Sequence, residues 1–350
     1  MTNHEGYMRR CIELARNGAG NTAPNPMVGC VIVNEGRIIG EGYHAVYGGP
    51  HAEVNAVRSV RDPRLLSSST MYVSLEPCSH HGKTPPCSDL ILNKRIPHVI
   101  IGTSDPFSEV AGKGIARLRQ GGVNVETGVL ESECRWQNRR FFTFHESSRP
   151  YVILKWAQTL DGFIAPENVP GQPVWISGRL ARTFVHKTRT EEGAILVGTE
   201  TVIMDNPSLT ARDWSGKSPL RVVIDRTGRI PFHYSVFNGE APTLVFTGGT
   251  GNWPEGVDAV QIRFDRDVPL QILQELYRRD IQSVIIEGGA VTLQHFINAG
   301  LWDEAHIFSG PEMFSRGVRA PLISGIPAER VHLDETVLTF MVNPFNRYIP

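Results

Sequence analysis

Residues 76–87 read EPCSHHGKTPPC, and a shorter stretch, GPHAE, precedes them at residues 49–53. Together they supply one histidine, His51, and two cysteines, Cys78 and Cys87. Imidazole and thiolate are donors that zinc prefers, and three protein ligands leave the fourth tetrahedral position open for a water, as in catalytic zinc sites. Zinc lowers the pKa of such a water to about 7. The two stretches therefore predict a catalytic zinc site.

Glu53 lies two residues after His51, where it is free to carry a proton instead of binding the metal. We expect it to take a proton from the attacking water and hand it to the substrate. Pro77 is typical of the first turn of a helix, where the helix dipole also favours thiolates. The same residues allow an alternative, a closed structural site in which His80 or His81 completes a Cys2His2 set.

Patterns typical of strands and helices alternate around both stretches. Apolar periodicity predicts helices at 4–18, 52–60, 88–95 and 112–120, and strands at 28–33, 37–41, 71–75, 98–102 and 123–127. This alternation predicts an α/β layered domain. The polar, helix-breaking stretch His145–Pro150 marks its end, so we expect one domain over 1–146 and a second over 150–350.

The second half repeats the α/β pattern. Apolar runs at 151–154, 194–197, 221–224, 243–246 and 283–286 predict strands, and 268–279 predicts a helix. No Gly-x-Gly-x-x-Gly follows a strand, so a Rossmann fingerprint is absent. Glu287–Thr292 instead places a glycine pair between a strand and a helix, which favours anion binding. Polar residues at 155–162 and 198–212 also follow strands, where open α/β sheets bind ligands.

Composition limits the classes of partner. The 350 residues carry 35 Lys and Arg against 36 Asp and Glu, a net charge of -1, which argues against duplex nucleic acid or a membrane surface as a partner. The amino terminus lacks the pattern of a secretory signal, and no stretch has the apolar length of a membrane helix. Five cysteines in a chain of this size suit a reducing compartment. We therefore expect a cytoplasmic protein with a small-molecule substrate.

His51-Ala52-Glu53 with Pro77-Cys78 resembles the zinc deaminase superfamily. Residues 79–86 separate the two cysteines, which departs from the Pro-Cys-x-x-Cys of the tRNA and cytidine branches and is similar to the deaminase half of bifunctional riboflavin-biosynthesis deaminase–reductases. The resemblance covers residues 1–146 and implies a cytidine-deaminase-like three-layer α/β fold. It implies hydrolytic deamination of 2,5-diamino-6-ribosylamino-4(3H)-pyrimidinone 5′-phosphate. The residues implied to contact that substrate are Asn25, His44, His80 and Lys83.

The second half resembles the reductase half of the same family, through Lys155–Gly162, Thr201–Arg212 and Glu287–Gly289. That half is similar in fold to dihydrofolate reductase and uses NADPH to reduce the ribosyl group of 5-amino-6-(5-phosphoribosylamino)uracil to ribityl. The implied NADPH-binding residues are Ala157, Trp175, Thr201, Asp205, Gly289, Ala290, Val291 and Thr292. The implied substrate contacts are Ser208, Leu209, Arg212 and Glu287. Lys155 and Asp205 are expected beside the carbon that accepts hydride. At Pro173 the family commonly has a serine.

Two other hypotheses remain beside the bifunctional enzyme. A zinc deaminase acting on nucleic-acid bases or free nucleosides would have Pro-Cys-x-x-Cys, and for nucleic acid a basic surface, and the sequence shows neither. A non-catalytic binding module with structural zinc gives no reason for Glu53 beside His51, or for the second set of polar segments. The family resemblance also implies a homo-oligomer.

Overall fold

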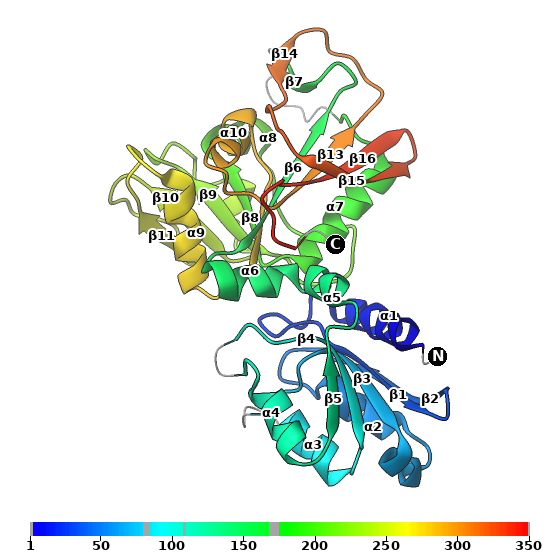
Figure 1. Cartoon of the computed structure of the whole chain (residues 1–350). Coiled ribbons are helices and arrows are strands. Elements are labelled where there is room, and N and C mark those ends of the chain that lie inside the picture. The colour runs from blue at the N-terminus through cyan, green and yellow to red at the C-terminus, as the bar shows by residue number, and fades with distance from the viewer. Residues whose placement is uncertain (1–2, 80–84, 108–109, 168–174, 349–350) are drawn as a thin grey trace. The chain divides into compact units, whose positions relative to one another are not determined.

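The computed structural model describes residues 3–79, 85–107, 110–167 and 175–348. The chain divides into two compact units, residues 1–147 with 348–350 and residues 148–347, each described by itself below (Figure 1). The sequence predicted a second domain over 150–350, whereas Tyr348 belongs to the first unit. There its hydroxyl donates to Glu146 Oε2 at 2.8 Å, and its ring packs in a cluster with Phe141 and Phe142.

A mixed sheet forms the centre of the described part of the first unit. Its strand order is β2-β1-β3-β4-β5. The strands are β1 (Gly29–Asn34), β2 (Arg37–Tyr43), β3 (Thr70–Leu75), β4 (His98–Thr103) and β5 (Asn124–Thr127). β1 runs antiparallel to β2 and β3, while β3, β4 and β5 are parallel. The carboxyl ends of β3 and β4 therefore lie at one edge, where Glu76 N–H donates to Thr103 O at 3.0 Å.

Helices cover both faces of this sheet. One buried cluster joins it to α2 (Ala52–Ser59), α3 (Cys87–Asn93) and α4 (Lys113–Gln120), and another joins it to α1 (His4–Ala15) and α5 (Glu131–Gln137). The 3-10 helices η1 (Arg16–Gly18) and η2 (Pro63–Ser68) lie in connections. The sequence predicted that residues 145–150 break the helix, but α6 (Arg139–Ser147) continues to Ser147, so the predicted break begins too early. Buried Phe142 and Phe144 sustain α6, which ends where Ser148 takes a left-handed φ of 50°.

A longer sheet forms the described part of the second unit. Its strand order is β11-β10-β9-β8-β12-β6-β13-β16-β15. The strands are β6 (Tyr151–Gln158), β8 (Ala194–Gly198), β9 (Leu220–Ile224), β10 (Thr243–Thr247), β11 (Val257–Gln261), β12 (Ser283–Ile286), β13 (Glu304–Ser309), β15 (Ile326–Leu333) and β16 (Thr336–Val342). Pairing is parallel from β11 to β13 and antiparallel from β13 through β16 to β15. A separate pair joins β7 (Phe163–Pro166) and β14 (Gly317–Arg319).

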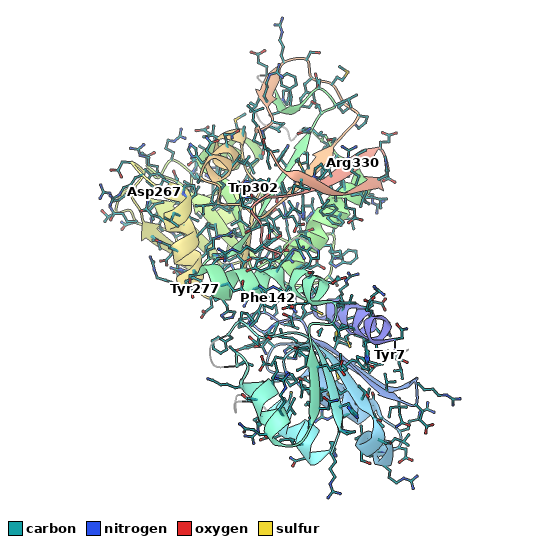
Figure 2. The ribbon with its side chains drawn as sticks, viewed as in Figure 1. Tyr7, Phe142, Asp267, Tyr277, Trp302 and Arg330 are labelled. Atoms are coloured by element: carbon teal, nitrogen blue, oxygen red, sulfur yellow. The ribbon has the colours of Figure 1, made fainter. Side chains whose placement is uncertain are left out.

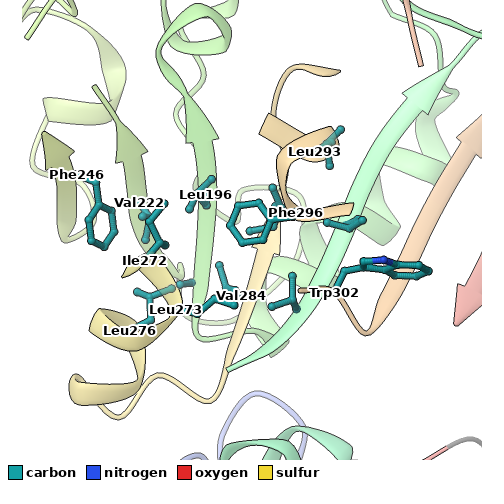
Figure 3. Packing of buried hydrophobic residues seen from close by; sticks show 14 of the residues in the cluster. Leu196, Val222, Phe246, Ile272, Leu273, Leu276, Val284, Leu293, Phe296 and Trp302 are labelled. Atoms are coloured by element: carbon teal, nitrogen blue, oxygen red, sulfur yellow. The ribbon is translucent and has the colours of Figure 1, made fainter. Parts of the chain in front are cut away.

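The two faces of this sheet pack against two different sets of helices. The large cluster in Figure 3 packs Leu196, Val222 and Val284 against α9 (Val268–Arg278) and α10 (Ala290–Asn298). Trp302, labelled in Figures 2 and 3, is 4% exposed and belongs to the same cluster. The opposite face packs against α7 (Arg179–Glu191), α8 (Thr199–Asp205) and the 3-10 helix η3 (Ser235–Phe237).

The register of the parallel strands determines which side chains are neighbours at the carboxyl end of this sheet. Leu154 of β6 pairs with Ile286 of β12, so the next residues along the two strands, Lys155 and Glu287, are neighbours at the carboxyl end of the sheet. Lys155 also pairs with His306 of β13. No helix in the described parts of the chain combines the length and apolar character needed to cross a membrane.

Candidate active sites

His51, Cys78 and Cys87 meet at one edge of the first sheet. His51 caps the start of α2, Cys78 follows the end of β3 and Cys87 is the first residue of α3. His51 Nδ1 lies 3.6 Å from Cys78 Sγ and 3.3 Å from Cys87 Sγ, and the three atoms are all within 4.8 Å of one another. The amide of Cys87 donates to Cys78 Sγ at 3.3 Å. The structure thus brings the three predicted ligands together.

This donor set fits zinc. One imidazole nitrogen and two sulfurs converge, and donor–donor distances of 3.3 and 3.6 Å suit metal–ligand bonds of about 2.0–2.3 Å. A hydrogen bond from the Cys87 thiol lowers the pKa of Cys78, against the effect of burial, and His51 adds to the lowering. A thiolate is the form that binds a metal. His80 and Lys83 lie outside the described residues, as does His81 of the alternative structural site.

Glu53 lies in the first turn of α2, two residues beyond His51, and only 3% of its surface is exposed. Burial raises the pKa of its carboxyl group, and the nearby Cys78 raises it further. A carboxyl group that binds protons more readily than usual, close to the metal ligands, is placed to carry a proton during catalysis. Glu53 is therefore buried close to Cys78, His51 and Cys87.

Asn25 and His44 lie beside the metal ligands. Asn25 Nδ2 is 3.2 Å from His44 Nε2, and His44 Nδ1 is 3.1 Å from the carbonyl oxygen of Pro50. With the Nδ1 proton donated to Pro50, Nε2 accepts from the Asn25 amide. The His44 and His51 rings meet edge to face, with centroids 5.3 Å apart. Burial lowers the pKa of His44, which favours the neutral ring. Asn25 and His44 thus form a hydrogen-bonded pair beside His51.

Lys155, Glu287 and Arg189 form the centre of the second site, between the sheet and α7. Lys155 Nζ donates to Glu287 Oε1 at 2.6 Å, and Arg189 Nη2 donates to Glu287 Oε2 at 2.8 Å. Burial alone would raise the pKa of Glu287, but the charges of Arg189 and Lys155 outweigh it and lower the pKa to about 2. A small cavity beside them is lined by Lys155, Val185, Thr188, Ile285, Glu287, His306 and Phe308.

Arg189 is absent from the residues that the sequence pointed to. It also donates from Nη1 to the carbonyl oxygen of Thr210 at 3.0 Å, so it joins Glu287 to the segment that contains Ser208 and Arg212. Its sequence signal is its position in α7. Ala181, Val185 and Arg189 follow one another at intervals of four residues, so the arginine interrupts the apolar stripe of the helix. A charged residue is almost never fully buried unless it is paired, so an arginine in such a stripe indicates a buried partner.

The turn between β12 and α10 forms a narrow backbone cradle. Gly289 N–H donates to Thr201 Oγ1 at 2.7 Å, so two predicted cofactor residues are joined. A Cβ atom on Gly198 would lie 2.6 Å from Thr292 Oγ1, and one on Gly289 would lie 3.3 Å from Thr201 Oγ1. Glycine at these two positions thus allows the threonines to pack closely against the turn. Val291, in the first turn of α10, is 70% exposed, so the start of this helix is open to an anionic group such as a phosphate of NADPH.

The other predicted residues of this unit lie on β6, at the end of α8, in the segment after α8 and before the start of α7. Arg212 Nη1 donates to Ser208 Oγ at 2.5 Å, and buried Leu209 takes a left-handed φ of 58° between them. Trp175 is 61% exposed, with the Arg182 guanidinium 4.5 Å from its ring centre. Ala157 lies near the end of β6. Asp205 is exposed at the end of α8 and has no hydrogen bond or ion pair with the described residues, so no such contact joins it to Lys155.

Comparisons with known proteins give a match for each unit of the chain. Residues 1–103 match the cytidine and deoxycytidylate deaminase zinc-binding region, and residues 150–339 match the RibD C-terminal domain. The chain is 43% identical to the riboflavin biosynthesis protein RibD of Actinobacillus pleuropneumoniae, over 88% of this chain and 83% of that protein. It is 40% identical to the RibD of Aquifex aeolicus, over 90% of this chain and 88% of that protein.

Solved structures give the same result. A deaminase/reductase from Thermotoga maritima superposes with a TM-score of 0.86 at 39% identity, covering 97% of this chain and 98% of that one. RibD of Acinetobacter baumannii superposes with a TM-score of 0.87 at 32% identity, with the same coverage. The predicted family, the two-domain α/β fold and the two cofactors are confirmed. The chain belongs to the RibD family of riboflavin biosynthesis and is a bifunctional enzyme, a zinc-dependent deaminase joined to an NADPH-dependent reductase.

Proposed function

We propose that this chain deaminates 2,5-diamino-6-ribosylamino-4(3H)-pyrimidinone 5′-phosphate and then reduces the ribosyl group of 5-amino-6-(5-phosphoribosylamino)uracil. The Thermotoga maritima relative is a diaminohydroxyphosphoribosylaminopyrimidine deaminase and 5-amino-6-(5-phosphoribosylamino)uracil reductase, which is the same pair of activities. The observation that carries the proposal is the convergence of His51, Cys78 and Cys87 beside the buried Glu53. We assign the deaminase to residues 1–146 and the reductase to residues 150–347.

In the deaminase site we assign His51, Cys78 and Cys87 as zinc ligands and Glu53 as the proton carrier. When bound, zinc supplies an activated water. Glu53 takes one proton of this water and delivers it to the departing amine, so that the ring carbon gains oxygen and ammonia leaves. Asn25 is proposed to present its amide to the pyrimidine, and His44, whose ring nitrogens bond Pro50 and Asn25, is proposed to orient that amide. His80 and Lys83 are proposed to bind the ribosyl phosphate, as a pair of cationic groups suits.

In the reductase site the cradle of Thr201 and Gly289–Thr292 holds the cofactor, with Ala157, Trp175 and Asp205 at its edge. When bound, NADPH supplies hydride for the first ribose carbon. The bond from that carbon to the ring oxygen breaks, and the oxygen takes up one proton, so each turnover consumes one proton as well as the hydride. Lys155, whose Nζ donates to Glu287 Oε1 at 2.6 Å, is proposed to donate this proton. Ser208, Leu209 and Arg212 are proposed to hold the substrate.

We further propose that the enzyme works in the cytoplasm as a homo-oligomer. All five cysteines are free thiols, which suits a reducing compartment. Leu160 and Met313 are 71% and 65% exposed, and Leu160 N–H donates to Glu312 O at 2.9 Å, so two neighbouring segments of the surface each carry an exposed apolar residue. Light scattering on the purified chain tests the oligomeric state. If the wild-type chain is a monomer and Met313→Glu has the same mass in solution, the homo-oligomer is contradicted.

A two-product assay tests the proposed activities. The purified chain is given the diaminopyrimidine phosphate and NADPH, and ammonia and NADP⁺ are both measured. Cys87→Ser is expected to lose zinc and ammonia release but to oxidise NADPH with the deaminated substrate, and Lys155→Met is expected to show the reverse. Glu41→Gln, which changes a carboxylate bound to Arg10 away from both sites, is the matched control. A wild-type chain that holds zinc and releases no ammonia would refute the deaminase assignment.

A further inference from the structure

Glu76 lies two residues before Cys78, and both oxygens of its carboxylate accept main-chain N–H groups. Oε1 accepts from Gly114 at 3.0 Å and from Ile115 at 3.2 Å. Oε2 accepts from Gly112 at 3.0 Å and from Asp105 at 3.3 Å. The side chain is 4% exposed, and no lysine, arginine or histidine of the described chain forms an ion pair with it. Four backbone donors therefore take the place of a cationic partner.

These donors belong to the start of α4. Gly114 and Ile115 lie in its first turn, where main-chain N–H groups have no acceptor within the helix. Gly112, at the N-cap, has no side chain with which to cap them, and its φ of 75° turns the chain into the helix. Glu76 therefore caps α4 from a distant strand, and its negative charge lies at the positive end of the helix. The contact fixes α4 to the end of β3.

The start of α4 also packs against the chain next to the proposed metal ligand Cys78. A Cβ atom on Gly114 would lie 1.9 Å from the carbonyl oxygen of Pro77, so the first turn of α4 packs directly on the peptide that leads into Cys78. From the other side, Ser88 N–H donates to Cys78 O at 3.1 Å, and Cys87 N–H donates to Cys78 Sγ at 3.3 Å. Cys78 is thus held between the starts of α3 and α4.

We propose that Glu76 is a positioning residue of the deaminase site. By binding the first turn of α4 it sets the backbone of Pro77 and Cys78, and so the place of the Cys78 sulfur relative to His51 and Cys87. It contacts neither metal nor substrate and acts through the main chain. The inference rests on the proposed function of this site, because it needs Cys78 to be a metal ligand.

Zinc affinity, measured by competition with a chromogenic chelator, tests the proposal on the full chain. Glu76→Gln keeps the volume of the side chain but replaces one acceptor oxygen by an NH2 group that faces N–H donors. We expect its zinc affinity to fall about tenfold to a hundredfold, as for other residues that orient metal ligands. Its cobalt-substituted form should show an altered visible spectrum. Ammonia release should fall with it, while NADPH oxidation by the second unit stays unchanged. A circular dichroism spectrum like that of wild type shows that the first unit is folded as well.

Further variants separate the possible failures. Glu41→Gln makes the same substitution at a carboxylate of the first unit that binds Arg10, and it should keep wild-type zinc affinity. Gly112→Ala disturbs the same helix start less, because only the left-handed φ of residue 112 opposes the new Cβ. It should lower zinc affinity less than Glu76→Gln does. It replaces Glu76→Gln as the test if that variant does not fold. If Cys78→Ser keeps wild-type zinc affinity, the proposed site itself is wrong. If Cys78→Ser loses zinc but Glu76→Gln keeps wild-type affinity and cobalt spectrum, the positioning role is refuted.

Discussion

Glu287→Gln removes one charge from a buried group of three. The Glu287 carboxylate accepts from Lys155 at 2.6 Å and from Arg189 at 2.8 Å, and its side chain is only 16% exposed. Burial by itself would raise the pKa of Glu287, and the two cations lower it from 4.5 to about 2. The substitution therefore leaves Lys155 and Arg189 close together without a balancing charge.

The size of the effect follows from the pKa. At about 1.4 kcal/mol per pKa unit, the lowering corresponds to roughly 3 kcal/mol of folding stability from the ionised carboxylate. Because the pKa is lower in the folded state, this contribution is fully present above pH 4.5 and is lost as the pH falls through about 2. The wild-type free energy of unfolding should thus decrease more steeply below pH 4.5 than that of Glu287→Gln.

Urea unfolding, followed by circular dichroism over the acid range in which both proteins remain folded, measures this difference. Taking wild type minus variant cancels the other carboxyl groups, which titrate in both proteins. The difference should be near 3 kcal/mol at neutral pH and should shrink on acidification. If the two proteins show the same pH dependence, Glu287 is not held as a carboxylate by Lys155 and Arg189, and the description of the reductase site is wrong.

Three other outcomes are expected. Removing the metal with dipicolinate should stop ammonia release, leave NADPH oxidation intact and be reversed by added zinc; equal loss of both activities contradicts two separate sites. Arg189→Lys cannot bind both Glu287 and Thr210 O, so the reductase kcat/KM should fall at least about tenfold, whereas an unchanged value removes Arg189 from the site. Phe296→Ala empties a position only 1% exposed in the core of the second unit and should cost about 3–5 kcal/mol in urea unfolding; a cost under about 1 kcal/mol contradicts that packing.

Local patterns predicted the elements that carry the deaminase site. The expected helix at 52–60 is α2 (Ala52–Ser59), and the expected strand at 71–75 is β3 (Thr70–Leu75). α2 buries one face in the core, which leaves an apolar period in its sequence. β3 is buried on both faces, and its apolar Met71, Val73 and Leu75 still alternate with Tyr72 and Ser74. His51 directly precedes α2 and Cys78 comes soon after β3, so the approximate place of these two ligands followed from the elements.

Contacts between distant segments could not be predicted in the same way. Glu76 and the start of α4 are far apart in the sequence, and nothing local shows that a carboxylate will cap that helix. β15 (Ile326–Leu333) was also missed, because it is an edge strand whose residues are mostly exposed and include Glu329 and Arg330, so it lacks an apolar alternation. Arg189 needed knowledge of which face of α7 is buried, as only the fold places it against Glu287.

The separation of the two sites is the central claim, and one measurement on Glu53→Gln tests it most directly. Glu53 is buried beside the metal ligands of the first unit, so the variant should release no ammonia from the diaminopyrimidine phosphate. Given 5-amino-6-(5-phosphoribosylamino)uracil, the same preparation should oxidise NADPH at the wild-type rate, because Lys155 and Glu287 lie in the second unit. Ammonia release within about tenfold of wild type, an effect below about 1.4 kcal/mol on the barrier, would contradict the role of Glu53. Loss of NADPH oxidation in the folded variant would contradict the independence of the two sites.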